Sequence, residues 1–192
     1  MFGIEALRSY PRYAEHSRET FDAAIELAHK VALEKFLPHN RKSDLNEPRM
    51  VDGKVVLIPE IEEGLKAFNE AGFMAVLADY GQGGMQLPHL LGQACFAWIQ
   101  AANVSSSVYA FLAQSAATVI EKFGSDDQRQ RFFQPMLEGR FFGTMCLTEP
   151  HAGSSLGDMR ATADLQADGS YRLRANKIFI SAGEHDLSEN IV

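Results

Sequence analysis

The chain has 192 residues, a net charge of −7 and 46% hydrophobic residues, which is ordinary for a globular protein of one large or two small domains. The acidic balance excludes the basic footprint of a nucleic-acid-binding surface, so we expect no nucleic-acid partner. No run approaches the ~18 apolar residues of a membrane-spanning helix, so we expect no membrane span.

The cysteines and the N-terminus indicate a cytoplasmic protein. Cys95 and Cys146 both lie in apolar surroundings, so we interpret them as buried free thiols rather than a disulfide, which suits a reducing cytosol. The first residues lack the basic start and the sustained apolar core of a signal peptide.

The spacing of apolar residues predicts helices in the first part of the chain, after a short helical turn near residues 5–9. Apolar residues recur at helical spacing from Phe21 to Ala32 and give that helix one buried face. Pro59 is suited to open the next helix and Gly72 to cap it. The following two are apolar on more than one face, so we expect them in the middle of a bundle. The four helices cover residues 15–36, 59–71, 88–103 and 104–123.

Two polar stretches of this part are predicted loops. Residues 40–54 read as an exposed loop. Residues 79–84 hold a glycine cluster that we interpret as structural, because it does not follow a strand and open a helix as a dinucleotide fingerprint should; phosphate binding is the alternative. Ser125–Gln128 matches a capping box and starts a further helix, which Pro135 is expected to break.

At Arg140 the pattern changes from helices to short strands with turns. Asp168-Gly169-Ser170 is a hairpin signal between two of them. We predict an α+β fold, with an all-α helical bundle over 1–139 followed by the beginning of a small antiparallel β domain over 140–192. About four strands leave an open sheet edge, so we expect the chain to continue in nature or to have been cut. The predicted strands cover residues 142–148, 160–167, 171–176 and 177–181.

The most informative stretch runs from Phe142 to Ala161. Its apolar first half suits a buried strand, which Glu149-Pro150 ends because proline lacks an amide proton and restricts the residue before it. The small polar residues from His151 to Gly157 then form a loop whose backbone N–H groups can approach a ligand. A strand that delivers the Thr148 hydroxyl into this loop can cradle a phosphate-bearing cofactor; an ordinary turn is the alternative.

Two motifs resemble a known enzyme family. The run from Met145 to Ser154, Met-Cys-Leu-Thr-Glu-Pro-His-Ala-Gly-Ser, closely resembles the flavin loop of acyl-CoA dehydrogenases. Lys177-Ile-Phe-Ile-Ser181 resembles the family's second flavin segment, in the same order and at a similar separation. The tail, residues 179–192, looks like the branch that includes 3-methylmercaptopropionyl-CoA dehydrogenases. The whole chain is similar to the N-terminal helical domain and the start of the middle β domain of this family, without its C-terminal helical domain.

The resemblance implies an FAD enzyme that removes two hydrogens from an acyl-CoA thioester, with electron-transferring flavoprotein as the acceptor and a homo-oligomer as the full-length form. Thr148 is then expected at the polar edge of the flavin ring, Ser181 near its N5 or O4, and Phe179 against its face. Gly153 and Ser154 would approach the pyrophosphate or the thioester, so Ser154 is also a substrate-binding candidate. The expected cofactor-binding residues are Met145, Cys146, Leu147, Thr148, Gly153, Ser154, Phe179, Ile180 and Ser181.

The sequence departs from the family's common pattern in places. Met145 stands where many members have tyrosine, Phe179 replaces a tryptophan and Ser181 a threonine, so the aromatic plane and the hydroxyl are kept. We interpret His151, which replaces a small residue, as structural or solvated rather than catalytic. Glu184-His185-Asp186 cannot converge on one ion in an extended strand, because alternate side chains point apart, so we predict no metal site.

No catalytic residue is assigned. In the family the base is a glutamate or aspartate of the C-terminal helical domain, beyond Val192, and Glu149 does not serve. We therefore expect these 192 residues alone to bind FAD weakly or not at all and to lack dehydrogenase activity. Two alternatives stay open: an acyl-CoA oxidase, and a non-catalytic relative that binds DNA or a protein on the same scaffold. The net charge of −7 argues against DNA.

Overall fold

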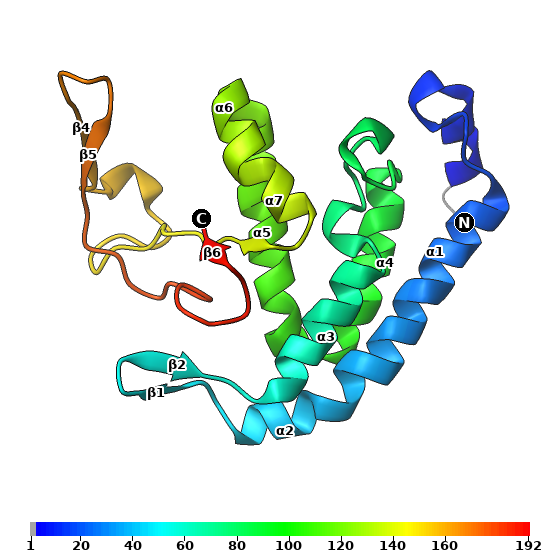
Figure 1. Cartoon of the computed structure of the whole chain (residues 1–192), viewed down its shortest axis with the longest axis horizontal. Coiled ribbons are helices and arrows are strands. Elements are labelled where there is room, and N and C mark those ends of the chain that lie inside the picture. The colour runs from blue at the N-terminus through cyan, green and yellow to red at the C-terminus, as the bar shows by residue number, and fades with distance from the viewer. Residues whose placement is uncertain (1–2) are drawn as a thin grey trace.

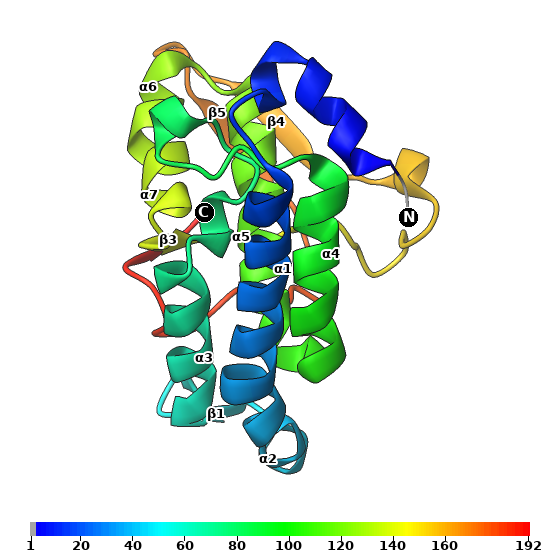
Figure 2. The same ribbon diagram turned by 90° about the vertical axis from the view of Figure 1, so that its right-hand side faces the viewer.

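A computed structural model describes residues 3–192, in which a helical bundle stands beside a smaller, irregular C-terminal part (Figure 1). The helices are α1 (Arg18–Val31), α2 (Asn40–Leu45), α3 (Pro59–Glu70), α4 (His89–Ala102), α5 (Val104–Phe123), α6 (Asp126–Gln128) and α7 (Gln134–Leu137). Helix α1 lies between α3 and α4, with α5 behind them (Figure 2). None of the helices in residues 3–192 is long and apolar enough to cross a membrane.

The predicted helices are confirmed to within a few residues at most ends. Helix α1 continues through a wider turn over Ala32–Phe36, so the two pieces fill most of the predicted range 15–36. Gly72 has a φ of 79° and ends α3 in the left-handed conformation that favours glycine. The path from α6 to α7 stays helical through a wider turn over Arg129–Phe133, so Pro135 does not separate two distinct helices.

The core of the bundle is an aromatic cluster around Phe68 of α3, whose side chain is 1% exposed. Its ring centroid lies 5.5 Å from that of Phe73, 5.6 Å from Phe96 and 6.5 Å from Phe36. These separations are typical of favourable aromatic pairs. The cluster joins α3 to α4, to the end of the first helical stretch and to the turn after α3.

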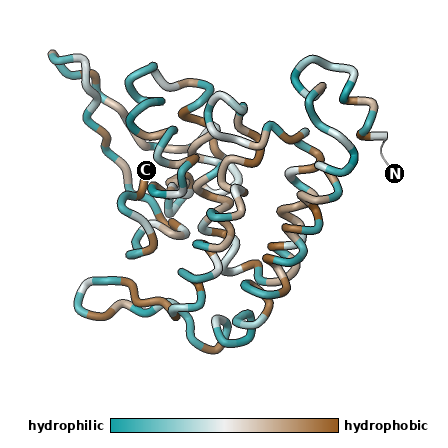
Figure 3. The backbone as a smooth tube through the Cα atoms, turned by 45° about the vertical axis from the view of Figure 1, so that its right-hand side comes forward, coloured by the Kyte–Doolittle hydropathy of each residue, from teal (hydrophilic) through white to brown (hydrophobic). Residues whose placement is uncertain are grey.

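The prediction for residues 40–54 was correct in exposure, since all but Ser43 are exposed, but wrong in structure, since they form a helix and a hairpin rather than a loop. Helix α2 begins at Asn40, and a hairpin follows with strands β1 (Arg49–Val51) and β2 (Lys54–Val56). Asp52 and Gly53 form its two-residue turn with φ of 50° and 80°, the left-handed pair that a type I′ turn needs. The polar composition concealed this signal. The hairpin projects from the bundle with an apolar stretch along it (Figure 3), and Met50 and Val56 are exposed.

The glycine cluster at 79–84 has a structural reason. A Cβ at Gly84 would lie 2.1 Å from the carbonyl oxygen of Ala78, so only glycine fits this tight turn. The N-terminal segment covers the turn, because Arg12 forms an ion pair with Asp79 and His16 Nε2 lies 2.9 Å from the Gln86 carbonyl oxygen. These contacts favour the structural interpretation over a phosphate site.

Four short strands lie in the C-terminal part: β3 (Phe141–Phe142), β4 (Thr162–Leu165), β5 (Tyr171–Arg174) and β6 (Asn190–Ile191). Strands β4 and β5 pair antiparallel, with Leu165 opposite Tyr171 and Gly169 at φ 84° in the turn, which confirms the predicted hairpin. Strands β3 and β6 pair in parallel. The helices end at Leu137 and β3 begins at Phe141, and we keep the domain boundary between residues 139 and 140 as a proposal.

Two expectations for the C-terminal part were wrong. The strand predicted over 142–148 stops at Phe142, and residues 177–181 form no strand, since Phe179 has a φ of 57°. A strand needs a continuous partner, and the described residues offer these segments only single bonds, such as Thr144 N–H to the Val192 oxygen at 3.0 Å. Both cysteines are free thiols, as predicted, and Cys95 is buried. Cys146 was also expected to be buried, but it is exposed, as are its neighbours Met145 and Leu147.

Candidate functional site

The two segments that resemble flavin-binding motifs lie side by side. The backbone N–H of Ile178 donates to the carbonyl oxygen of Thr148 at 3.0 Å. The Thr144 hydroxyl donates to the carbonyl oxygen of Ser181 at 2.6 Å. Segments about 30 to 40 residues apart in the sequence are thus joined by hydrogen bonds at two points, and the stretches that carry Thr148 and Ser181 are neighbours in space.

Glu149 holds this surface together. Its side chain is 3% exposed, and its carboxylate accepts bonds from the backbone N–H groups of Arg160 at 2.8 Å and Ala161 at 3.0 Å. Lys177 Nζ donates to it at 2.8 Å and to the carbonyl oxygen of Leu147 at 3.0 Å. The hydrogen bond from Lys177, followed by those from the backbone, lowers the pKa of Glu149 to about 2. The carboxylate is therefore ionised and ties three segments of the chain together.

His151 lies beside Glu149 in the loop, and its structural or solvated role stays a prediction. Its Nε2 lies 3.2 Å from the carbonyl oxygen of Asp158 and 3.5 Å from the carboxylate of Glu149. This position supports the loop around Glu149. Residues 3–192 contain no group of three or more histidine, cysteine, aspartate or glutamate side chains placed to hold a metal ion.

Most predicted cofactor residues are exposed. The side chain of Phe179 is 85% exposed, and Met145, Cys146, Leu147, Gly153, Ser154 and Ser181 are exposed as well, whereas Thr148 and Ile180 are half-buried. The Phe179 backbone is also in the left-handed region, which is rare for a bulky residue and marks a strained position. An exposed aromatic ring on a strained backbone indicates a ligand site. Neither the exposure nor the strain can be predicted from the sequence.

The chemistry of these groups fits an amphipathic aromatic cofactor such as FAD. Among the described residues, the hydroxyls of Thr148, Ser154 and Ser181 make no hydrogen bond, so they are free to bind a polar ring edge or a phosphate. Phe179 offers an aromatic face beside them. A Cβ at Gly153 would meet no atom of the described chain within 4 Å, so a close approach of a cofactor there stays a prediction.

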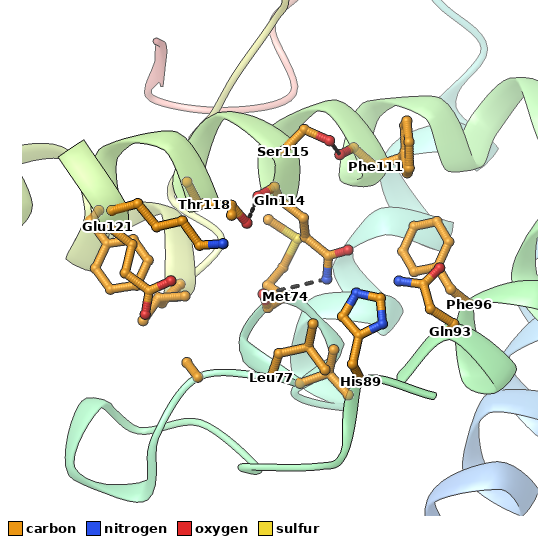
Figure 4. Close-up of a pocket in the computed structure, with 16 residues that line it drawn as sticks. Met74, Leu77, His89, Gln93, Phe96, Phe111, Gln114, Ser115, Thr118 and Glu121 are labelled. Atoms are coloured by element: carbon orange, nitrogen blue, oxygen red, sulfur yellow. Dashed lines mark hydrogen bonds between the residues drawn. The ribbon is translucent and has the colours of Figure 1, made fainter. Parts of the chain in front are cut away.

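A cavity of about 430 Å³ lies on another side of α5 (Figure 4). Met74, Phe96 and Phe111 give it apolar walls, and Gln114 Nε2 donates to the Phe73 carbonyl oxygen at 2.7 Å. Figure 4 shows His89 and Gln93 of α4 facing α5 across it. The volume suits a small ligand or part of a larger one. The sequence predicts both helices but not this space, because it depends on how their side chains meet.

The cavity and the C-terminal part of the chain contact different faces of α5. Residues Gln114 and Thr118 line the cavity, whereas Tyr109 contacts His185 of the C-terminal part, with ring centroids 5.3 Å apart. At 100° per residue, Thr118 lies about half a turn of the helix wheel away from Tyr109. Phe111 is shared between the cavity and an exposed apolar side of α5, which carries Val104, Phe111, Val119 and Phe123.

Sequence reasoning missed four residues that build the site. Glu149 was considered only as the end of a strand and as a rejected base, and Lys177 only as part of a motif; their buried ion pair appears only in the fold. Thr144 and His185 were not expected to bind anything. Spacing carries no signal for these contacts, because each partner lies far away in the sequence or on another element.

Comparisons with known proteins find relatives over the whole length of the chain. The family model "Acyl-CoA dehydrogenase, N-terminal domain" matches residues 18–140. The whole chain is 35% identical to the 3-methylmercaptopropionyl-CoA dehydrogenase of Ruegeria pomeroyi and covers 34% of it. Over 91% of its length it is 32% identical to a butyryl-CoA dehydrogenase of Syntrophomonas wolfei, covering 29% of that protein. The chain thus spans about a third of the length of these relatives.

Solved structures show the same fold. The butyryl-CoA dehydrogenase of Megasphaera elsdenii superposes with a TM-score of 0.69 at 23% identity, over 86% of this chain and 41% of that one. An acyl-CoA dehydrogenase from Bacillus anthracis, solved in complex with FAD, gives a TM-score of 0.70 at 20% identity, over 90% of this chain and 28% of that one. The predicted combination of a helical bundle with the start of a β domain is confirmed at the level of the fold.

Proposed function

Because the chain belongs to the acyl-CoA dehydrogenase family, we propose that it is the N-terminal part of an FAD-dependent enzyme that converts an acyl-CoA thioester to the 2-enoyl-CoA. The observation that carries the proposal is the pairing of the two flavin-like segments through Ile178 N–H and the Thr148 carbonyl oxygen. This pairing supports a shared cofactor surface, because it brings together the stretches that carry Thr148 and Ser181. The branch of 3-methylmercaptopropionyl-CoA dehydrogenases is supported by the identity over the whole chain.

In this proposal the chain's own residues bind and orient the cofactor, and bound FAD supplies the acceptor for the hydride that leaves Cβ of the substrate. The hydroxyls of Thr148 and Ser181 bind the polar edge of the ring, and the Phe179 side chain packs against its face. Ser154 binds the pyrophosphate or the thioester from the loop. Lys177 and Glu149 hold these groups in place without touching the reacting atoms.

The base that takes the Cα proton is proposed to lie outside these residues. Glu149 is the nearest carboxylate in sequence to the flavin loop, but its pKa of about 2 makes it a weak base, and both of its oxygens accept hydrogen bonds. A carboxylate from the part of the relatives that this chain does not cover is the better candidate. The isolated chain is then inactive.

The acyl group is proposed to lie along α5. Its exposed apolar side includes Val104, Phe111 and Val119, and Phe111 leads into the cavity between α4 and α5. Exposed apolar side chains gathered on one side of a helix suit contact with a ligand or with further protein. We propose electron-transferring flavoprotein as the acceptor, a homo-oligomer as the full-length assembly and the cytoplasm as the compartment.

Two alternatives keep specific tests. An acyl-CoA oxidase shares the flavin residues, and rapid reoxidation of substrate-reduced flavin in air would identify it. A non-catalytic binding protein on the same scaffold would leave Thr148 and Ser181 without a cofactor. The net charge of −7 disfavours nucleic acid as its partner.

The test is the visible absorption spectrum of the protein with FAD, recorded under anaerobic conditions before and after addition of acyl-CoA. We expect the 192-residue chain to retain little flavin and the full-length protein to retain flavin that acyl-CoA bleaches. Ser181→Ala should weaken flavin binding in the full-length protein, whereas Ser170→Ala, at an exposed serine of the β4–β5 turn, should not. A full-length protein that holds no flavin contradicts the proposal, and bleaching by the isolated chain places a base within residues 1–192.

A further inference from the structure

The residues from Ser181 to Val192 form a closed loop, and Thr144 binds both of its ends. The Thr144 hydroxyl donates to the Ser181 carbonyl oxygen at 2.6 Å, and its backbone N–H donates to the Val192 carbonyl oxygen at 3.0 Å. Compact surface loops whose ends lie close together are frequently functional. The first residue of this loop is Ser181, a proposed flavin contact, so the place of the loop decides where that hydroxyl lies.

The side chain of His185 packs this loop against the helical bundle. It is 5% exposed and lies edge to face with Tyr109 of α5, at 5.3 Å between centroids, and with Phe142 of β3, at 5.7 Å. Its Nδ1 accepts the Leu187 N–H at 3.2 Å. Its Nε2 is buried with no hydrogen-bond partner among the described residues, so packing rather than hydrogen bonding to the bundle holds the ring.

The neighbours of His185 bind a second element. The Glu184 carboxylate accepts the Val55 N–H of β2 at 2.6 Å, and the Asp186 carboxylate lies 3.5 Å from Lys54 Nζ. Alternate side chains of this segment therefore point apart: His185 packs against Tyr109 and Phe142, whereas Glu184 and Asp186 contact the hairpin. Gly183 lets the chain turn tightly, because a Cβ there would lie 2.9 Å from Cγ2 of Ile180.

From these contacts we infer that His185 is a positioning residue. Its ring packs against Tyr109 and Phe142 and thereby docks the loop 181–192 on the bundle, which fixes Phe179 and Ser181 for the cofactor. The docking follows from contacts of this chain alone; its role toward flavin rests on the proposed function. His185 acts through the loop and touches no reacting atom.

Hydrogen–deuterium exchange of the 192-residue chain tests the docking without any flavin. His185→Ala should accelerate exchange about tenfold or more at the amides of Glu189 and Val192, which join the loop to the carbonyl oxygens of Arg140 and Phe142. Amides of α1 and α4 should keep their wild-type rates. His185→Phe, which retains a buried ring, should restore protection. Thr144→Val removes only the bond to Ser181 and should loosen the loop at that end.

His39→Ala is the matched control, because His39 is equally buried at 3% exposure but bonds Ser106 within the bundle at 2.9 Å. It should accelerate exchange among the helices and leave the amides of the loop 181–192 at their wild-type rates. The inference is overturned if His185→Ala leaves the loop protected, if it matches the His39→Ala pattern, or if His185→Phe fails to restore protection.

A flavin titration of the full-length protein then tests the link to the cofactor. His185→Ala should weaken FAD binding and alter the flavin absorption bands, and His185→Phe should recover both. Normal FAD binding and spectrum in His185→Ala would overturn the link even where the loop is loosened. Absence of flavin from the wild-type protein would instead contradict the proposed function, with the exchange result still deciding the docking.

Discussion

Truncating two phenylalanines tests whether Phe179 belongs to the fold or to a ligand site. Phe68→Ala and Phe179→Ala are the same chemical change, made where the side chain is 1% and 85% exposed, respectively. Loss of a buried phenylalanine costs about 3–5 kcal/mol, from lost burial and from the cavity left behind. An exposed substitution stays within about 0.5 kcal/mol. For a chain of this size the first corresponds to a fall in Tm of about 6–20 °C and the second to a change of about 2 °C or less.

Urea unfolding of the 192-residue chain, followed by far-ultraviolet circular dichroism, measures both free energies of unfolding on one scale. An unchanged slope against urea shows that a variant alters stability rather than the amount of surface exposed. A loss above about 1.5 kcal/mol in Phe179→Ala would refute the view that the fold leaves this ring free for a ligand. A loss below about 1 kcal/mol in Phe68→Ala would refute the placement of the core around α3.

Three further outcomes follow from the charges and thiols. The pKa of Glu149 is about 2 against an ordinary 4.5, so its ionised form stabilises the fold above pH ~4.5, and this contribution is lost as the pH falls toward ~2. Over this pH range the urea midpoint of Glu149→Gln should fall less steeply than that of the wild-type chain. Burial lowers the pKa of His39 and His185, so the fold favours their neutral forms at neutral pH. The Tm should therefore fall as the pH drops below ~6.5, and it should fall less in His39→Gln than in the wild-type chain. Cys146 is exposed, whereas burial raises the pKa of Cys95 to about 11, so a thiol reagent should label one cysteine in the native chain and two in urea.

Most of the helical bundle could be predicted from the sequence, because its signals are local. Apolar residues at helical spacing, Pro59 at a helix start and a left-handed Gly72 at its end each act within a few residues. The hairpin at Asp52-Gly53 carried an equally local signal, and only the weight given to polar composition hid it. The two motifs that resemble flavin-binding segments could also be recognised in the sequence, since each is a continuous run of residues.

What the tertiary structure alone decided is how distant residues meet. The burial of Glu149 with Lys177, the closure of the loop 181–192 by Thr144 and the packing of His185 join residues 28, 37 and 76 positions apart. The same holds for the exposure of Cys146 and for the failure of residues 142–148 to form a full strand, since both depend on which partners stand beside them. Local sequence sets the backbone preference of a segment, but burial and hydrogen-bond pairing are properties of its neighbours in space.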